Sequence, residues 1–137
     1  MTVNLEMRVL VVEDTRTMAK ILRNLLKLIG FMHVDAVFDG ATALRMLRAN
    51  KYGLVISDWN MQPMTGQMLL EQIRADPGLE SLPFIVVTAD TRLAPVQTAK
   101  EAGASGYVIK PFSGETLKQK IVAAASNTAN STSLLVA

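Results

Sequence analysis

Carboxylate, hydroxyl and ammonium side chains follow four short apolar runs in this chain. Short runs rich in Val, Ile and Leu, separated by helix-length stretches, are typical of central strands in a parallel sheet, whose carboxyl ends share one edge. We therefore expect these polar side chains to lie together although they are distant in sequence. The runs are 9–12 before Glu13 and Asp14, 54–57 before Asp58, 84–87 before Thr88, and 107–109 before Lys110.

Three carboxylates at one edge indicate a divalent cation. Two unit charges about 4 Å apart repel by roughly 4 kcal/mol at an effective dielectric near 20, so Glu13, Asp14 and Asp58 cannot all stay ionised without compensation. Lys110 supplies one positive charge, and a cation could supply the remainder. Oxygen ligands without His or Cys favour a hard ion, and a site that leaves room for water and phosphate favours Mg²⁺.

Such a site suits the transfer of a phosphoryl group to a carboxylate. Mg²⁺ and Lys110 would neutralise charge on the phosphate oxygens while a neighbouring carboxylate stays nucleophilic. Asp58 is the candidate acceptor because it stands alone after a predicted central strand, whereas the adjacent Glu13 and Asp14 are suited to binding metal together. The alternative is that these are unrelated polar residues on loops, which leaves their shared edge unexplained.

Helical periodicity separates the predicted strands. Further helices are predicted at about 40–50, 67–75, 93–102 and 114–125, and the alternation within 32–36 predicts a half-exposed edge strand that buries Met32, Val34 and Ala36. Strands alternating with helices predict a three-layer α/β sandwich with a five-stranded parallel sheet. The first helix, between Asp14 and Gly30, is predicted to bury Met18, Ile21, Leu22, Leu25, Leu26 and Ile29.

The 137 residues, half of them hydrophobic, are enough for one domain, which we place at 1–125. Segment 126–137 is rich in Ser, Thr and Asn, and we interpret it as a flexible tail, with a partner-docking peptide as the alternative. The chain has no cysteine, which excludes disulfides and thiolate metal sites. It shows neither a secretory signal nor an apolar run near the roughly 20 residues of a membrane span, so we expect a soluble cytoplasmic protein.

The net charge of +2 is too small to indicate a nucleic-acid partner. Arg16, Lys20, Arg23 and Lys27 nevertheless fall on one stripe with helical spacing. We interpret the stripe as the solvated face of the first helix, and binding of an anionic partner is the alternative.

Over about residues 7–125 the chain resembles the receiver domains of two-component response regulators, in particular those of chemotaxis that stand alone. The motifs are Val-Val-Glu-Asp, Val-Ile-Ser-Asp-Trp-Asn-Met, Val-Val-Thr-Ala and Gly-Ala-Ser-Gly-Tyr-Val-Ile-Lys-Pro-Phe. The resemblance implies the flavodoxin-like strand order 2-1-3-4-5. It also implies that Asp58 accepts phosphate from a histidine kinase, and that Glu13, Asp14, Asp58 and the backbone carbonyl of Asn60 hold Mg²⁺.

The resemblance further implies a switch. Thr88 and Lys110 would contact phosphate oxygens, and Tyr107 would follow Thr88 inward, changing the surface formed by the fourth helix, fifth strand and fifth helix. Asn60 and Asp90 would tune the lifetime of the phosphate by controlling access of water. The peptide bond before Pro111 would be cis.

The loop after Asn60 departs from the usual receiver pattern. Its proline, Pro63, comes one place later than usual, and Thr65 replaces an aspartate, so its shape and its fit to a given kinase are open. We expect Trp59 to be a partly exposed loop aromatic that could report on the metal. The methionines are expected mostly in the core, with an adaptable contact surface of Met61, Met64 and Met68 as the alternative.

We expect a monomeric response regulator whose partner-binding surface changes on phosphorylation, with the flagellar motor switch as its target. It would catalyse only its own phosphoryl transfer and dephosphorylation. One alternative is a phosphate sink or relay without motor binding. Another is an Mg²⁺-dependent phosphohydrolase with an aspartyl intermediate, which would need a second aspartate at the position of Asn60.

Overall fold

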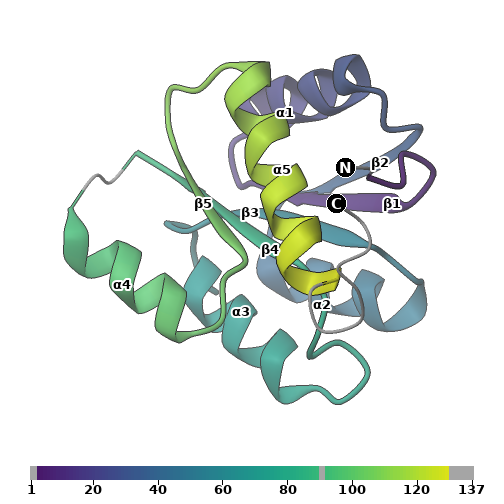
Figure 1. Ribbon diagram of the computed structural model, residues 1–137. Coiled ribbons are helices and arrows are strands. Elements are labelled where there is room, and N and C mark those ends of the chain that lie inside the picture. Colours follow the sequence, from purple (N-terminus) through teal and green to yellow (C-terminus); the bar gives the residue numbers. More distant parts are fainter. Residues whose placement is uncertain (1–2, 90–91, 130–137) are drawn as a thin grey trace.

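The chain folds into a parallel β-sheet with helices on both faces (Figure 1). The computed structural model describes residues 3–89 and 92–129, in which five strands alternate with five helices. The strand order is β2-β1-β3-β4-β5, which confirms the predicted three-layer α/β sandwich and its strand order. The elements are β1 (Arg8–Val12), α1 (Arg16–Ile29), β2 (His33–Val37), α2 (Gly40–Ala49), β3 (Leu54–Asp58), α3 (Gly66–Ala75), β4 (Phe84–Thr88), α4 (Leu93–Glu101), β5 (Gly106–Ile109) and α5 (Gly114–Ala129).

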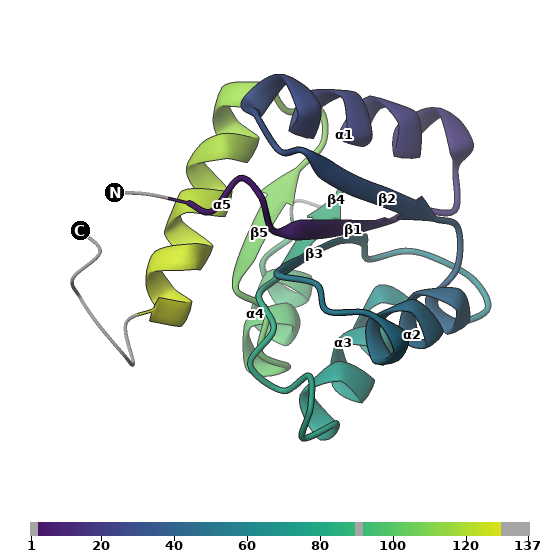
Figure 2. The same cartoon turned by 90° about the vertical axis from the view of Figure 1, so that its right-hand side faces the viewer.

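The helices divide between the two faces of the sheet (Figure 2). Alternate residues of a strand point to opposite faces, so Val9 and Val11 pack with α1 and α5, whereas Leu10 and Val12 pack toward α2 and α3. Strands β3 and β4 are buried along their whole length. Continuous apolar runs in the sequence therefore mark strands that are covered on both faces.

Local signals begin and end the helices. Asp39 caps α2 by accepting a hydrogen bond from the Thr42 N–H at 2.7 Å, and Thr65 caps α3 in the same way through Met68. Gly30 ends α1 with a φ of 125°, a conformation that favours glycine. Thr65 thus takes a capping role that aspartate also fills, so its replacement of the usual residue leaves the start of α3 intact.

The first helix buries the predicted face except at Ile21, with Met18, Leu25 and Ile29 half-buried against the core. Ala19, Leu22 and Leu26 are its buried residues, whereas Ile21 is 45% exposed. The prediction of Ile21 in the core was wrong because the contact with the sheet is narrower than the apolar stripe. Met32 is also wrong as a core residue: β2 begins one residue later, and Met32 is 65% exposed.

A polar cluster ties the edge of the sheet to the neighbouring loop. The Tyr52 hydroxyl donates to Asp35 Oδ2 at 2.6 Å, and the Arg8 guanidinium donates to the same oxygen at 3.1 Å. The Tyr52 hydrogen bond is the main cause that lowers the pKa of Asp35, and burial together with that bond raises the pKa of Tyr52 to about 12. This cluster joins β1, β2 and the start of β3.

Arg74 fastens the end of α3 to two distant segments. Its guanidinium donates hydrogen bonds to the carbonyl oxygens of Gly103, Leu82 and Glu80, with the Leu82 bond at 2.6 Å. Gly103 lies in the turn between α4 and β5, and Leu82 precedes β4. One side chain thereby links α3 to the turn before β5 and to the segment before β4.

The last helix is longer than predicted. Helix α5 continues to Ala129, so residues 126–129, which we assigned to the tail, are helical. The rest of the predicted tail, 130–137, lies outside the described residues. Within the described residues, no helix combines the length and the apolar character needed to cross a bilayer.

Candidate functional site

The predicted polar residues meet at the carboxyl edge of the sheet because the central strands are in register. Val12 of β1 pairs with Ser57 of β3, which brings the following residues, Glu13 and Asp58, side by side. On the other side of β3, Asp58 pairs with Val87 and places Thr88 next along β4. The register therefore confirms the shared edge that the sequence predicted.

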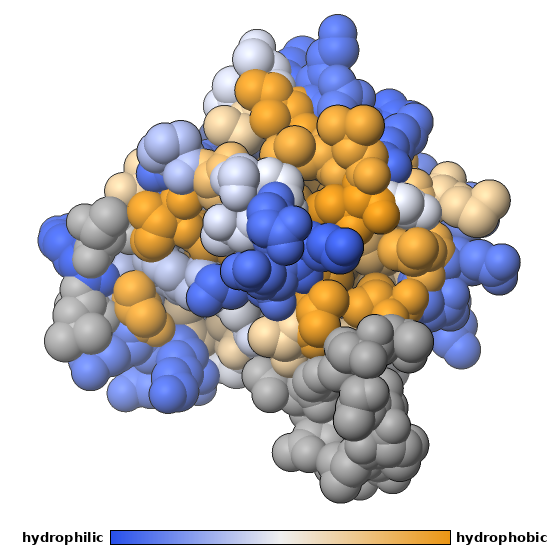
Figure 3. Space-filling model, turned by 45° about the horizontal axis from the view of Figure 1, so that its top comes forward, coloured by the Kyte–Doolittle hydropathy of each residue, from blue (hydrophilic) through white to orange (hydrophobic). Residues whose placement is uncertain are grey.

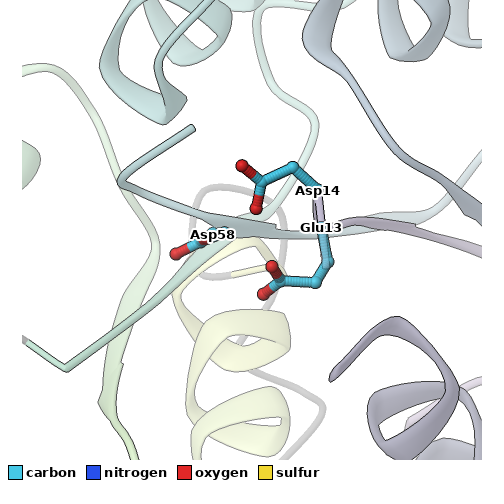
Figure 4. Close-up of side chains that lie close together, drawn as sticks. All are labelled: Glu13, Asp14 and Asp58. Atoms are coloured by element: carbon cyan, nitrogen blue, oxygen red, sulfur yellow. The ribbon is translucent and has the colours of Figure 1, made fainter. Parts of the chain in front are cut away.

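Three carboxylates converge at this edge (Figure 4). One oxygen from each of Glu13, Asp14 and Asp58 lies within 4.8 Å of the other two. Glu13 is only 1% exposed and Asp58 only 6%, whereas Asp14 is exposed. The cluster is thus buried on one side and open to solvent at Asp14.

Lys110 reaches into the cluster from the end of β5. Its ammonium group lies 3.1 Å from Glu13 Oε1 and 3.6 Å from Asp58 Oδ1. Burial raises the pKa of the Glu13 carboxyl, and the nearby charge of Asp58 adds to that rise, while hydrogen bonds from the Thr15 N–H and from Lys110 oppose it. One ammonium group cannot neutralise three carboxylates, so an excess of negative charge remains.

The donor set fits a hard divalent cation. It consists of carboxylate oxygens without nitrogen or sulfur, and its exposed member, Asp14, leaves space for water or phosphate beside the buried pair. Glu13, Asp14 and Asp58 are the residues that would hold Mg²⁺. The predicted contribution of the Asn60 backbone carbonyl stays a prediction.

Thr88 and Asn60 line the same edge. The Asn60 side-chain amide donates to the Thr88 hydroxyl at 3.3 Å, and its backbone N–H donates to Asp58 Oδ1 at 3.4 Å. Thr88 is fully buried, and Asn60 is exposed. Asn60 therefore bridges the candidate acceptor and the candidate switch hydroxyl. Asp90, the other residue predicted to tune phosphate lifetime, lies outside the described residues.

Tyr107 lies on the same sheet face as Thr88. It pairs with Val86, two residues before Thr88 on β4, and packs half-buried against the core that α2 and α3 cover. Residues two apart on a strand share a face, so the two side chains are diagonal neighbours. The peptide bond before Pro111 is cis, as predicted, and so is the bond before Pro63.

The loop between Asp58 and α3 packs against the site more closely than the sequence suggested. Gly66 donates its N–H to the Trp59 carbonyl at 2.9 Å. A Cβ atom at Gly66 would collide with the Asp58 carbonyl oxygen and lie 2.7 Å from the Trp59 Cα. Gly66 is a supporting residue that we missed; the Thr-Gly pair at the helix start was its sequence signal.

One prediction about this loop was wrong, and the expectation that its methionines lie mostly in the core is confirmed for Met61. Trp59 is only 8% exposed and belongs to the core between the sheet, α2 and α3, rather than being a partly exposed aromatic. Met61 is buried in the same core, which leaves Met68 as the one exposed member of the alternative methionine surface, with Met64 half-buried. The short loop returns to α3 through Gly66, and this path turns both side chains inward.

Comparison with known proteins agrees with this geometry. The response regulator receiver domain family matches residues 9–122. The chain is 44% identical over 115 residues to the chemotaxis protein CheY of Pseudomonas aeruginosa, covering 84% of this chain and 93% of that protein. The crystal structure of the chemotaxis protein CheY4 of Vibrio cholerae superposes with a TM-score of 0.80 at 29% identity, covering 85% of this chain and 97% of that one.

A further structural relative carries a metal at its site. It is the receiver domain of a sensor histidine kinase from Pseudomonas aeruginosa, solved with a magnesium ion coordinated in the active site cleft. Its TM-score is 0.77 at 25% identity, and the alignment covers 85% of this chain and 94% of that one.

Proposed function

The chain belongs to the response regulator receiver domain family, and from that premise we propose that it accepts a phosphoryl group on Asp58 from a histidine kinase. The observation that carries the proposal is the position of Asp58, buried beside two further carboxylates and 3.6 Å from Lys110. The family is a signalling domain rather than a conventional enzyme, so the reaction serves to change binding.

In the proposed reaction, a carboxylate oxygen of Asp58 attacks the phosphorus atom of a phosphohistidine. The new P–O bond forms as the P–N bond breaks, and the imidazole nitrogen leaves with the bonding electrons and takes up a proton. Bound Mg²⁺ would supply neutralising charge for the phosphate oxygens. Lys110 would exchange one carboxylate contact for a phosphate oxygen, which keeps its charge paired throughout.

The proposed output is a change at the face formed by α4, β5 and α5. A phosphate on Asp58 adds acceptor oxygens next to Thr88, whose hydroxyl accepts a bond from Asn60. If that hydroxyl turned toward the phosphate, it would leave space beside Thr88. Tyr107, which lies on the same face of the sheet, would then move inward into that space. The relatives are named chemotaxis proteins, and we therefore propose the flagellar motor switch as the target of this face.

The acceptor is tested by labelling with a small phosphodonor and Mg²⁺, followed by mass spectrometry of the peptide that contains Asp58. We expect one acid-labile phosphate on Asp58, and none in the Asp58→Asn variant. Lys110→Ala should still bind Mg²⁺ but should fail to change the output face, measured by NMR shifts around Tyr107. Label on another residue, or an unaltered response without Lys110, would contradict the respective assignment.

A separate measurement tests the target. The phosphate mimic beryllofluoride, added with Mg²⁺, should strengthen binding to a purified motor-switch protein. Turnover of phosphate from a kinase with no such binding would instead favour the phosphate-sink alternative.

A further inference from the structure

Four cationic side chains of α1 line a hollow beside the edge strand β2. The hollow has a volume of about 380 Å³. The side chains at its base are small, Ala19 from α1 and Ala36 from β2, and this keeps the space open. Its exposed cationic lining consists of Arg16, Lys20, Arg23 and Lys27, the stripe that the sequence singled out and the proposed function does not use.

Within residues 3–89 and 92–129, none of these four cations forms an ion pair; the ion pairs there are made by Arg8, Arg48 and Lys110. Arg23 interacts electrostatically with Asp35, but Asp35 Oδ2 already accepts hydrogen bonds from Arg8 and Tyr52 and so does not pair with Arg23 directly. Arg16 is held in place at the groove, since its guanidinium lies 4.3 Å from the centre of the Phe38 ring. A concave surface with unpaired, partly ordered positive charge is suited to an anionic occupant.

We propose that the α1–β2 groove binds an acidic helix of a protein partner. From Arg16 to Lys27 the stripe extends about 16.5 Å along the helix axis, at about 1.5 Å per residue. A second helix with carboxylates at i, i+4, i+7 and i+11 has the same axial spacing. In an extended peptide, side chains on one side repeat at about 6.7 Å, so four would span about 20 Å and lose register by about 3.5 Å.

Duplex nucleic acid fits the groove less well. A duplex carries one negative charge per about 1.7 Å of axis, or about ten charges over the length of the stripe, against four cations. The acidic edge formed by Glu13, Asp14 and Asp58 lies just before the first turn of α1 and would repel a polyanion that continues past Arg16. A short acidic helix avoids both conflicts.

The groove is distinct from the apolar side of α1. Ile21 and Leu28 are exposed about a third of a turn away from the cationic stripe. Figure 3 looks down on α1 and α5 and shows hydrophobic side chains gathered beside hydrophilic ones on this part of the surface. An occupant of the groove would leave the apolar side and the phosphorylation site uncovered, so its binding does not depend on the proposed function.

The test uses two fluorescent peptides of identical composition, designed as helices. One carries glutamates at i, i+4, i+7 and i+11, and the other distributes them around the helix. Anisotropy at about 50 mM salt should show tighter binding of the striped peptide to the full chain, weakening as salt rises. NMR shifts should map to α1 and β2, and Asp58→Asn should bind equally well, which separates this test from that of phosphorylation.

Charge-reversal variants locate the site. Lys20→Glu with Arg23→Glu should weaken binding at least about tenfold, because like charges then face each other. Arg45→Glu with Lys51→Glu, the same charge change at exposed positions outside the groove, should stay within about twofold. Circular dichroism checks folding, and the milder pair Lys20→Gln with Arg23→Gln should still lower affinity if the reversal variant does not fold.

Three results would overturn the proposal. The first is equal binding of the striped and distributed peptides, and the second is an equal loss in the control double variant. The third is tighter binding of a duplex oligonucleotide through Lys20 and Arg23, which would assign the groove to nucleic acid instead.

Discussion

Replacing Asp58 by asparagine should stabilise the metal-free protein. The change removes one charge from a cluster in which Glu13 and Asp14 oxygens lie within 4.8 Å of Asp58, while Lys110 lies 3.6 Å away. At an effective dielectric near 20, each repulsion at that separation is worth about 3.5 kcal/mol, and the attraction to Lys110 about 4.6 kcal/mol. Because Asp14 is exposed, solvent screens its share to roughly half or less.

With half of the Asp14 repulsion retained, the balance favours the variant by about 0.6 kcal/mol, and the relief from burying an ionised Asp58 adds to it. Urea unfolding at pH 7.5 with a chelator measures this difference. Added Mg²⁺ should stabilise the native chain more than the variant, so that the difference shrinks or reverses as the metal concentration rises.

Asp39→Asn is the matched control. It makes the same chemical change at an N-cap, where asparagine keeps the bond from the Thr42 N–H but loses the one from the Thr42 hydroxyl. Stability should therefore fall by about 1 kcal/mol or less and should not respond to Mg²⁺. If Asp58→Asn were clearly less stable than the native chain in chelator, the ion pair with Lys110 would outweigh the repulsion, and the charge argument for a metal would fail.

Three shorter predictions concern the surroundings of the site and the sheet edge. Gly66→Ala should cost about 2 kcal/mol or more and weaken Mg²⁺ binding, because its Cβ would displace the backbone at Asp58, whereas Gly78→Ala, whose Cβ has its nearest neighbour at 3.4 Å, should be nearly neutral in urea unfolding. Millimolar Mg²⁺ should change the fluorescence of Trp59, and an unchanged spectrum would count against a metal beside Asp58. Tyr52→Phe should cost about 1 kcal/mol at pH 7 by removing a hydrogen bond to a charged group. Because that bond lowers the pKa of Asp35, its contribution is present above pH 3.8 and is lost as the pH falls through the folded-state pKa, so the two unfolding curves should converge in acid.

The central strands and the site edge could be predicted from the sequence because one physical pattern determines both. A strand covered on both faces must be almost wholly apolar, as β3 and β4 are before their last residues apart from the buried Ser57. The polar residue that ends such a strand lies at the edge of the sheet, as Asp58 and Thr88 do. The register of the parallel strands then brings these residues together, and no other sequence signal is needed to predict that they meet.

Side-chain burial outside the central strands was less predictable because it depends on which other elements pack against each side chain in the folded protein. Ile21 has the spacing of a core residue, yet it is 45% exposed at the margin of the apolar stripe, and Trp59 follows an edge carboxylate, yet the loop turns it inward. The collision that an added Cβ at Gly66 would cause depends on the path of the whole loop. Such contacts are set by tertiary packing, which periodicity alone does not describe.

The bonds from Arg74 to Gly103 and Leu82 have a mechanical consequence for the output face. They hold the turn that follows α4 against α3 and the segment before β4, at the opposite end of the strands from the cluster of Glu13, Asp14 and Asp58. With α4 held at this end, a small displacement beside Thr88 would rotate the proposed output face about the turn at Gly103.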